Sequence, residues 1–157
     1  MFTKTNNAEE ISVHIRWMIR RDLPEVLEIE AESFEFPWFE EDFIRARKQR
    51  NCIMMVTEYE SKIVGFMIYE LHKNYIHIPN FAVSCQFRRL GVGSQMIAKL
   101  IAKLESSKKS KITLGIRETN LPAQLFFREN GFKAVSVLHN HYSDTSEDVY
   151  LFEFKHF

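Results

Sequence analysis

One stretch of this chain, residues 80–104, constrains its fold more than any other. The stretch is typical of a strand that ends at Val83, followed by a tight loop and a helix. The loop carries Arg88, Arg89, Gly91 and Gly93. Apolar residues recur at helical spacing after it: Met96, Ile97, Leu100, Ile101 and Leu104. This spacing predicts a helix that begins near Gly93.

The start of this helix is a predicted anion site. The first N–H groups of a helix lack backbone partners and the helix dipole is positive there, so an anion is favoured. Gly91 and Gly93 have no Cβ and let the backbone approach a phosphate, and the two arginines add charged donors. The spacing matches neither a dinucleotide fingerprint nor a P-loop. An ordinary strand-to-helix turn explains two glycines alone equally well, but the arginines before them favour a pyrophosphate site.

Length and composition narrow the class of protein. A chain of 157 residues favours a single domain, which we expect over residues 12–157, after a flexible tail over residues 1–11. Hydrophobic residues make up 45% of the chain, which is enough to form a core. The 21 basic and 21 acidic residues cancel, so we expect neither a nucleic acid nor a membrane as partner. The two cysteines form no disulfide framework, and no Cys/His spacing indicates a metal site. The N-terminus has no apolar signal sequence, so we expect a cytoplasmic protein.

The predicted elements run strand, helix, helix, three strands, helix, strand, helix and two strands. This order predicts an α/β (α+β) fold, a mixed central sheet with helices on both faces. The strands are expected at residues 13–19, 53–59, 63–72, 75–83, 111–117, 132–138 and 148–154. The helices are expected at residues 22–34, 39–47, 93–106 and 121–130.

Several positions carry finer structural expectations. Asp22 and Glu25 are spaced as a capping box for the first helix. Phe43 and Ile44 are expected to point inward from the second helix. Gly131 is expected to end the last helix in the left-handed conformation.

The pattern Arg88-x-x-Gly91-x-Gly93 resembles the acyl-CoA signature of the GNAT N-acetyltransferases, Gln/Arg-x-x-Gly-x-Gly/Ala. The resemblance covers the chain from about Val13 to Phe154. It implies the GNAT fold, in which the fourth and fifth strands splay apart and the pantetheine arm of acetyl-CoA lies in the gap. Pro79, inside the expected fourth strand, fits a bulge that GNAT proteins have near this position.

Other segments are similar to the bacterial ribosomal-protein alanine N-acetyltransferases and, at one position, to archaeal N-terminal acetyltransferases. The bacterial pattern is carried by Glu32-Ser-Phe34, Phe36-Pro-Trp38, Asn80-Phe-Ala-Val83, Ile116-Arg-Glu-Thr-Asn120 and Asn140-His-Tyr142. The implied reaction is direct transfer of an acetyl group from acetyl-CoA to a protein N-terminal α-amine.

The resemblance also implies which residues bind each substrate. A backbone N–H near Val83 would polarise the thioester carbonyl. The implied peptide-binding residues are Phe36, Pro37, Trp38 and Tyr142. The implied acetyl-CoA contacts are Phe81, Ala82, Val83, Arg88, Arg89, Leu90, Gly91, Val92, Gly93, Ser94 and Asn120.

The chain departs from these relatives at two catalytic positions. Where the bacterial enzymes carry a glutamate this chain has Gly115, and where they carry a tyrosine it has Phe127. The resemblance points instead to His77, where archaeal relatives can carry a histidine, and to Tyr142 in the last loop. An imidazole titrates near ~6.5, which suits a base at neutral pH. A structural role for His77 and a packing role for Tyr142 stay open.

The missing glutamate favours one kind of acceptor. A peptide α-amine has a pKa of about 7.7–8 and a lysine about 10.4, so roughly one α-amine in ten is neutral at pH 7 but only about one lysine in a few thousand. A site without a strong base therefore loses little on an N-terminus. The alternatives are a GNAT acting on a small-molecule amine and a non-catalytic acetyl-CoA-binding module. We expect a monomer or weak dimer.

Overall fold

The computed structural model describes residues 9–139 and 147–156. Its elements follow the predicted order, with two short 3-10 helices, η1 and η2, added before α1 and before α3. The strands are β1 (His14–Trp17), β2 (Cys52–Tyr59), β3 (Lys62–Leu71), β4 (Tyr75–Val83), β5 (Lys111–Arg117), β6 (Lys133–Leu138) and β7 (Val149–Lys155). The helices are η1 (Arg20–Asp22), α1 (Leu23–Ser33), α2 (Glu40–Arg47), η2 (Cys85–Phe87), α3 (Val92–Ser106) and α4 (Leu121–Glu129).

The strands form one mixed seven-stranded sheet in the order β1-β2-β3-β4-β5-β7-β6. The pairs β1–β2, β5–β7 and β6–β7 are antiparallel, whereas β4 and β5 run parallel. The parallel register joins Tyr75–His77 to Lys111–Thr113, at the start of both strands. Pro79 lies two residues further along β4 and has no N–H for a ladder bond. The pairing is consistent with the expected splay between the fourth and fifth strands.

The described residues divide into two compact units. Unit 1 contains the chain up to Ile68 together with Asn80–Lys99, and unit 2 contains Tyr69–Pro79 and the chain from Leu100 onward. Strands β3 and β4 and helix α3 each contribute residues to both units. The single domain expected over residues 12–157 stays a prediction.

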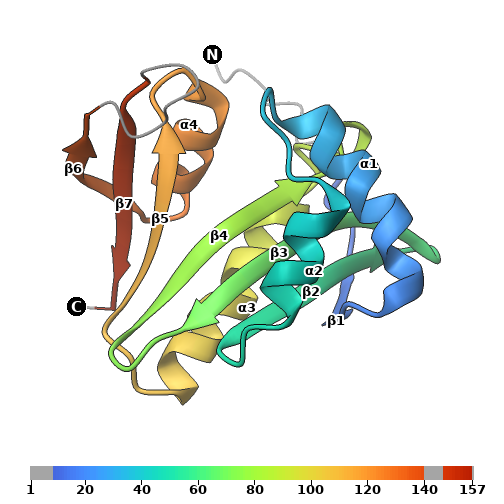
Figure 1. The fold of residues 1–157 in the computed structure, drawn as a ribbon, viewed down its shortest axis with the longest axis horizontal. Helices are drawn as coiled ribbons and strands as arrows, with labels where there is room; N and C mark the ends of the chain where they lie inside the picture. Colours follow the sequence, from blue (N-terminus) through green and yellow to red (C-terminus); the bar gives the residue numbers. More distant parts are fainter. Residues whose placement is uncertain (1–8, 140–146, 157) are drawn as a thin grey trace, which may run out of the picture. The chain divides into compact units, whose positions relative to one another are not determined.

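In unit 1, helices cover both faces of the strands, as predicted (Figure 1). On one face, α1 and α2 pack against β2, β3 and β4 through a buried cluster of Val26, Ile29, Phe43, Val56, Ile63, Phe66, Ile68 and Ala82. On the other face lies the first half of α3. The Met96 sulfur lies 3.2 Å from the point where a Cβ on Gly65 would be, so a glycine at this position lets the helix approach the strand.

In unit 2, α4 ends as the sequence predicts. Gly131 has φ +91°. The Phe132 N–H donates to the Phe127 carbonyl oxygen at 3.0 Å and the Gly131 N–H to that of Arg128 at 3.1 Å, which is the Schellman pattern. The Phe132 ring then packs edge-to-face on Phe127, with ring centroids 5.1 Å apart. The glycine therefore turns the chain so that Phe132 enters the core.

Two of the finer expectations are wrong. Asp22 and Glu25 do not form a capping box, because the Asp22 carboxylate accepts from the Ile19 N–H at 2.8 Å and the Glu25 carboxylate from the Ile63 N–H at 3.1 Å. Both donors lie outside the predicted helix, because Ile19 directly precedes the 3-10 turn η1 and Ile63 lies at the start of β3. Ile44 is 43% exposed whereas Phe43 is 1% exposed, because the short helix α2 buries only one narrow face.

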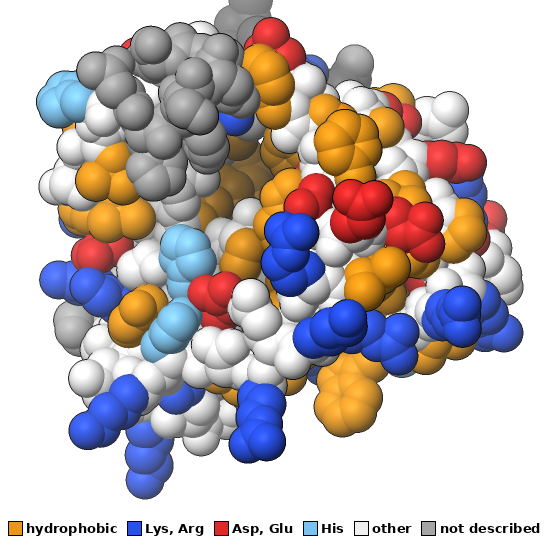
Figure 2. Space-filling model, in the orientation of Figure 1, with side chains coloured by type: hydrophobic (Ala, Val, Ile, Leu, Met, Phe, Trp, Pro, Cys, Tyr) orange, Lys and Arg blue, Asp and Glu red, His pale blue; other side chains and the backbone are white. Residues whose placement is uncertain are grey.

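The face of the molecule seen in Figure 2 is not dominated by side chains of one charge. Basic, acidic and hydrophobic side chains are interspersed over it, in keeping with the zero net charge. In the part of the chain that the structure describes, no helix is long and apolar enough to cross a membrane.

Candidate active site

The predicted anion site spans residues 88–94, the turn before α3 and the first residues of that helix, which we call the cradle loop. Two of its residues have left-handed backbone conformations, Arg89 with φ 63° and Gly91 with φ 78°. Turns that contain left-handed residues can direct successive backbone N–H groups toward one side, which is the basis of anion-binding nests. The first bond of α3 runs from the Gln95 N–H to the Gly91 carbonyl oxygen at 3.2 Å. The N–H groups of residues 92–94 precede it and can serve an anion.

The two arginines of the cradle loop differ in what they contact. The Arg88 guanidinium donates to the Val83 carbonyl oxygen at 3.2 Å and to the Ser33 hydroxyl at 3.3 Å. Arg88 therefore ties the loop to the end of β4 and to α1. Arg89 is exposed.

A segment that the sequence reasoning missed, residues 9–13, borders the cradle loop. The Ile11 N–H donates to the Leu90 carbonyl oxygen at 3.1 Å, and the Gln95 amide donates to that of Ile11 at 2.7 Å. The carboxyl carbon of Glu10 lies 3.1 Å from where a Cβ on Gly91 would be. Nothing in the polar sequence of this segment signals the contact, because it depends on backbone groups and one distant glutamine.

The predicted acetyl-binding residues lie at the end of β4. Ala82 is buried in the core cluster, whereas Phe81 and Val83 are half-buried and point to the opposite side of the strand. The Ser84 N–H donates to the Val64 carbonyl oxygen at 2.8 Å, which continues the pairing with β3 past Val83. Core packing on one side and a backbone bond beyond Val83 thus fix this part of the strand.

The predicted peptide-binding loop, residues 36–38, is held at Trp38. The Trp38 N–H donates to the Glu30 carboxylate at 2.9 Å, and its ring packs edge-to-face on Phe43 with centroids 5.3 Å apart. Pro37 is half-buried and Phe36 is 40% exposed. The Trp38 ring therefore packs against the core, whereas Phe36 is the more exposed of the two.

His77, the predicted base, lies in unit 2. It is half-buried on β4, with its Nδ1 2.8 Å from the Thr113 hydroxyl oxygen on β5. Burial lowers the pKa of His77, the Glu70 carboxylate acts against this, and His72 adds to it. The imidazole is consequently neutral at pH 7, which is the form that accepts a proton.

The two positions where the relatives carry catalytic side chains have no such groups here. Gly115 is exposed on β5, and a Cβ there would lie 2.9 Å from a methyl carbon of Val149. Phe127 is 4% exposed and belongs to the core of unit 2. A larger residue at 115 would require Val149 to move.

Other predicted residues lie near the end of β5 or outside the described residues. The Asn120 side chain caps α4 by accepting from the Ala123 N–H at 3.3 Å. Buried Glu147 pairs with Arg117 at 3.0 Å and also accepts from the Thr119 hydroxyl. The Thr119 hydroxyl and then Arg117 lower the pKa of Glu147. Tyr142 lies outside the described residues, so its two predicted roles stay predictions.

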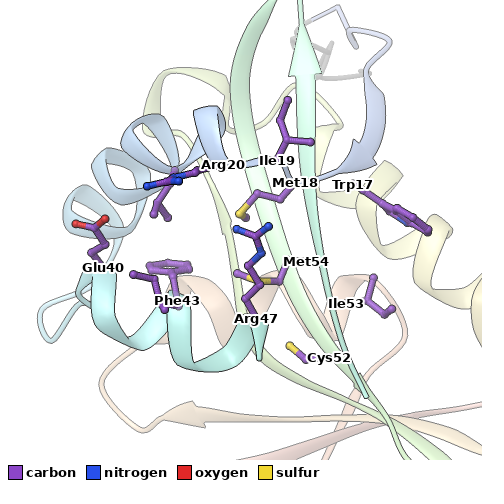
Figure 3. Close-up of a pocket in the computed structure, with 12 residues that line it drawn as sticks. Trp17, Met18, Ile19, Arg20, Glu40, Phe43, Arg47, Cys52, Ile53 and Met54 are labelled. Atoms are coloured by element: carbon purple, nitrogen blue, oxygen red, sulfur yellow. The ribbon is translucent and has the colours of Figure 1, made fainter. Parts of the chain in front are cut away.

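A pocket of about 460 Å³ in unit 1 contains none of the predicted site residues (Figure 3). Its lining comes from the segment around β1 and η1, from α2 and from β2. Figure 3 places Phe43, Met18 and Met54 around it together with Arg47. Among the described residues, no group of three or more His, Cys, Asp or Glu side chains is arranged to hold a metal ion.

Comparisons with known proteins agree with the fold and identify the family. The profile of the acetyltransferase (GNAT) family matches residues 23–132. The ribosomal protein bS18-alanine N-acetyltransferase of Escherichia coli K12 is 27% identical over 124 residues, which cover 79% of this chain and 83% of the relative. An N-alpha-acetyltransferase of Sulfurisphaera tokodaii is 29% identical over 122 residues, 69% of this chain and 72% of the relative.

A solved structure matches the fold. The crystal structure of Ard1 from Thermoplasma volcanium superposes with a TM-score of 0.83 at 24% identity, over 92% of this chain and 98% of that one. The family profile spans most of this chain, including β4, the cradle loop and α4. The chain therefore belongs to the acetyltransferase (GNAT) family and is an acetyl-CoA-dependent N-acetyltransferase.

Proposed function

We propose that this enzyme transfers the acetyl group of acetyl-CoA to the α-amine of a protein N-terminus. The observation that carries the proposal is Gly115, an exposed position without a carboxylate, where a Cβ would lie 2.9 Å from a methyl carbon of Val149. An enzyme without that base works best on an amine of low pKa, and an α-amine has one. The relatives named as alanine N-acetyltransferase and N-alpha-acetyltransferase support the same acceptor.

In this proposal, unit 1 binds acetyl-CoA. The N–H groups of Val92, Gly93 and Ser94, the nest around Gly91 and the exposed Arg89 hold the pyrophosphate. Arg88 acts mainly by holding the loop, since its guanidinium already bonds to Val83 and Ser33. The pantetheine arm runs along Phe81 and Ala82, and the Val83 N–H polarises the thioester carbonyl. Asn120 is proposed as a further contact.

His77 is proposed to accept a proton from the substrate amine, and Tyr142 to donate one to the leaving thiolate. For His77 to act as base, its Nδ1–H donates to the Thr113 hydroxyl oxygen and its Nε2 lone pair takes a proton from the ammonium form of the substrate. The neutral amine attacks the thioester carbonyl carbon, the C–S bond breaks, and the CoA thiolate leaves. Tyr142 then protonates the thiolate, the surplus proton on the new amide nitrogen passes through water to the tyrosinate, and His77 releases its proton to solvent. Phe36, Pro37 and Trp38 line the peptide site.

Transfer to a panel of short peptides with free or blocked N-termini, measured as CoA release, tests this proposal. We expect turnover on free N-termini and none on blocked peptides that still contain lysine. His77→Gln is the matched variant, because an amide can keep the bond to Thr113. Its kcat should fall about tenfold at pH 7, since roughly one α-amine in ten is already neutral. The deficit should shrink toward pH 9.

The panel also contains the outcomes that contradict the proposal. Equal transfer to blocked, lysine-containing peptides would exclude an α-amine acceptor. Turnover on small amines alone would indicate a small-molecule GNAT. Binding of acetyl-CoA with no transfer to any amine would indicate a non-catalytic module. Tyr142→Phe, assayed in parallel, should lower kcat if the tyrosine protonates the thiolate.

A further inference from the structure

Glu30 is a buried carboxylate in unit 1 for which the reaction described above has no use. It lies in the last turns of α1 and is 2% exposed. One carboxylate oxygen accepts from the Trp38 backbone N–H at 2.9 Å, and the other accepts from the Asn80 side-chain amide at 2.8 Å. Asn80 is itself 6% exposed and directly precedes Phe81 on β4.

These two bonds give Glu30 a specific position between two parts of the proposed site. Trp38 ends the loop proposed to bind the peptide, and Asn80 begins the segment proposed to bind the acetyl group. The Trp38 ring is held separately by Phe43, so the loop is fixed at its backbone by Glu30 and at its ring by the core. Losing the carboxylate would free the loop backbone while the ring stays packed.

A carboxylate suits this position although burying it is unfavourable. Both of these donors are neutral. Burial raises the pKa of Glu30, and the nearby Asp42 carboxylate raises it further. The hydrogen bonds from Trp38 and Asn80 act in the opposite direction and lower it. A glutamine of the same shape has one acceptor oxygen instead of two. It can serve Trp38 or Asn80 but not both, so only an acidic side chain satisfies both donors at once.

We propose that Glu30 is a positioning residue that sets the peptide-binding loop, residues 36–38, relative to the acetyl-binding end of β4. This inference rests on the proposed function, because it assigns the loop to the peptide. Glu30 is not a catalytic base, because it is almost fully buried and both of its oxygens already accept hydrogen bonds. Its effect on catalysis is exerted through Trp38 and Asn80.

The test compares Glu30→Gln with a double variant that restores both bonds. In Glu30→Gln we expect the KM for the peptide to rise about tenfold, with the KM for acetyl-CoA within twofold of wild type. Adding Asn80→Asp reverses the polarity of the side-chain bond. The introduced amide then donates to the introduced carboxylate, and its oxygen still accepts from the Trp38 N–H. The double variant should return to within about threefold of the wild-type peptide KM.

Two controls separate positioning from general damage. Glu28→Gln makes the same substitution on an exposed position of the same helix and should leave both KM values unchanged. Asn80→Asp alone places two carboxylates against each other and should be worse than the double variant. Circular dichroism and thermal unfolding of each variant confirm that the fold persists.

Several results would overturn the positioning role. They are an unchanged peptide KM in Glu30→Gln, an equal rise in both KM values, or a double variant no better than the worse single one. If Glu30→Gln does not fold, a folded double variant with near wild-type peptide KM supports the role and one with impaired peptide KM refutes it. Wild-type transfer to a free N-terminus is measured first. An inactive wild type refutes the proposed function, whereas an active one with unaffected variants refutes only the role of Glu30.

Discussion

At the scale of single residues, the cradle loop depends on a backbone conformation that glycine adopts readily. Gly91 has φ +78°, a conformation that costs a residue with a Cβ about 1–2 kcal/mol. Arg89 adopts a similar φ of 63° with a full side chain, so the loop already contains one strained position. A second strained residue would favour a different loop conformation, in which the N–H groups no longer converge on the pyrophosphate.

We therefore predict that Gly91→Ala raises the KM for acetyl-CoA about tenfold, the equivalent of about 1.4 kcal/mol. Gly131→Ala is the matched control, because Gly131 also has a left-handed φ, +91°, but ends α4. It should lower the thermal midpoint without changing that KM. Steady-state kinetics and thermal unfolding of both variants make the comparison. Equal effects of the two substitutions on the KM would show that strain alone, and not the cradle loop, is responsible.

How far the sequence predicts single residues depends on where their partners come from. Gly131 was predictable, because a glycine after a helical pattern has few other reasons to be there. Asp22 and Glu25 were not, because their donors lie in and just after β1 and at the start of β3. The left-handed Arg89 was also not predictable. The roles of His77 and Tyr142 came from resemblance and stay predictions.

At the scale of elements, Asp22 joins β1 to α1. Asp22 is 3% exposed. Its carboxylate accepts two hydrogen bonds from the Arg16 guanidinium, at 2.8 and 2.9 Å, and one from the Ile19 N–H. Arg16 is only partly exposed, so water screens this pair less than a surface pair. These bonds, that of Arg16 above all, lower the pKa of Asp22.

This pairing predicts a pH-dependent contribution to stability. Because the pKa of Asp22 is lower in the folded protein, its contribution is complete above about pH 4 and is lost as the pH falls below that value. Asp22→Asn should lower the free energy of unfolding by about 2 kcal/mol at pH 7, and the difference from wild type should narrow toward pH 2–3. Urea unfolding at several pH values measures it. Asp42→Asn, at an exposed pair with Arg45, should cost less than about 1 kcal/mol; a similar loss in both variants would contradict the assignment.

A second element-scale prediction concerns β5 and β7. A Cβ at Gly115 would lie 2.9 Å from a methyl carbon of Val149, and Val149 pairs with Arg117 two residues along β5. Gly115→Ala should therefore cost about 1–3 kcal/mol of stability through overpacking. Val149→Ala should cost stability on its own but remove most of the penalty of the alanine at 115. A double-mutant cycle by chemical unfolding measures the coupling, and additive losses would refute the contact.

At the scale of elements the sequence was most informative, because hydrophobic period and turn residues are local signals. β4 and β5 have the predicted bounds, and the other elements differ by a few residues at their ends. What the sequence could not predict depends on distant segments that meet only after folding. Examples are the contact of residues 9–13 with Leu90 and Gln95, and the position of Glu30 between Trp38 and Asn80.

At the scale of the whole molecule, the single-domain prediction can be tested with the two tryptophans. Trp17 and Trp38 both lie in unit 1, whereas the secondary structure is spread over both units. Because β3, β4 and α3 each contribute to both units, we expect tryptophan fluorescence and far-UV circular dichroism to give one coincident urea transition. A fluorescence transition that is separate from the circular dichroism transition would show that the units unfold independently.

The Val149 methyl group beside Gly115 also bears on how this chain can change by mutation. A glutamate at 115, which the resemblance to the bacterial enzymes places there, meets a clash as long as Val149 is present. A smaller residue at 149 removes that clash, and by itself it loosens the packing between β5 and β7. We therefore expect each change alone to lower stability and the two together to cost less than the sum of the single changes. Under the function proposed above, glycine at this position favours acceptors that need little help in losing a proton.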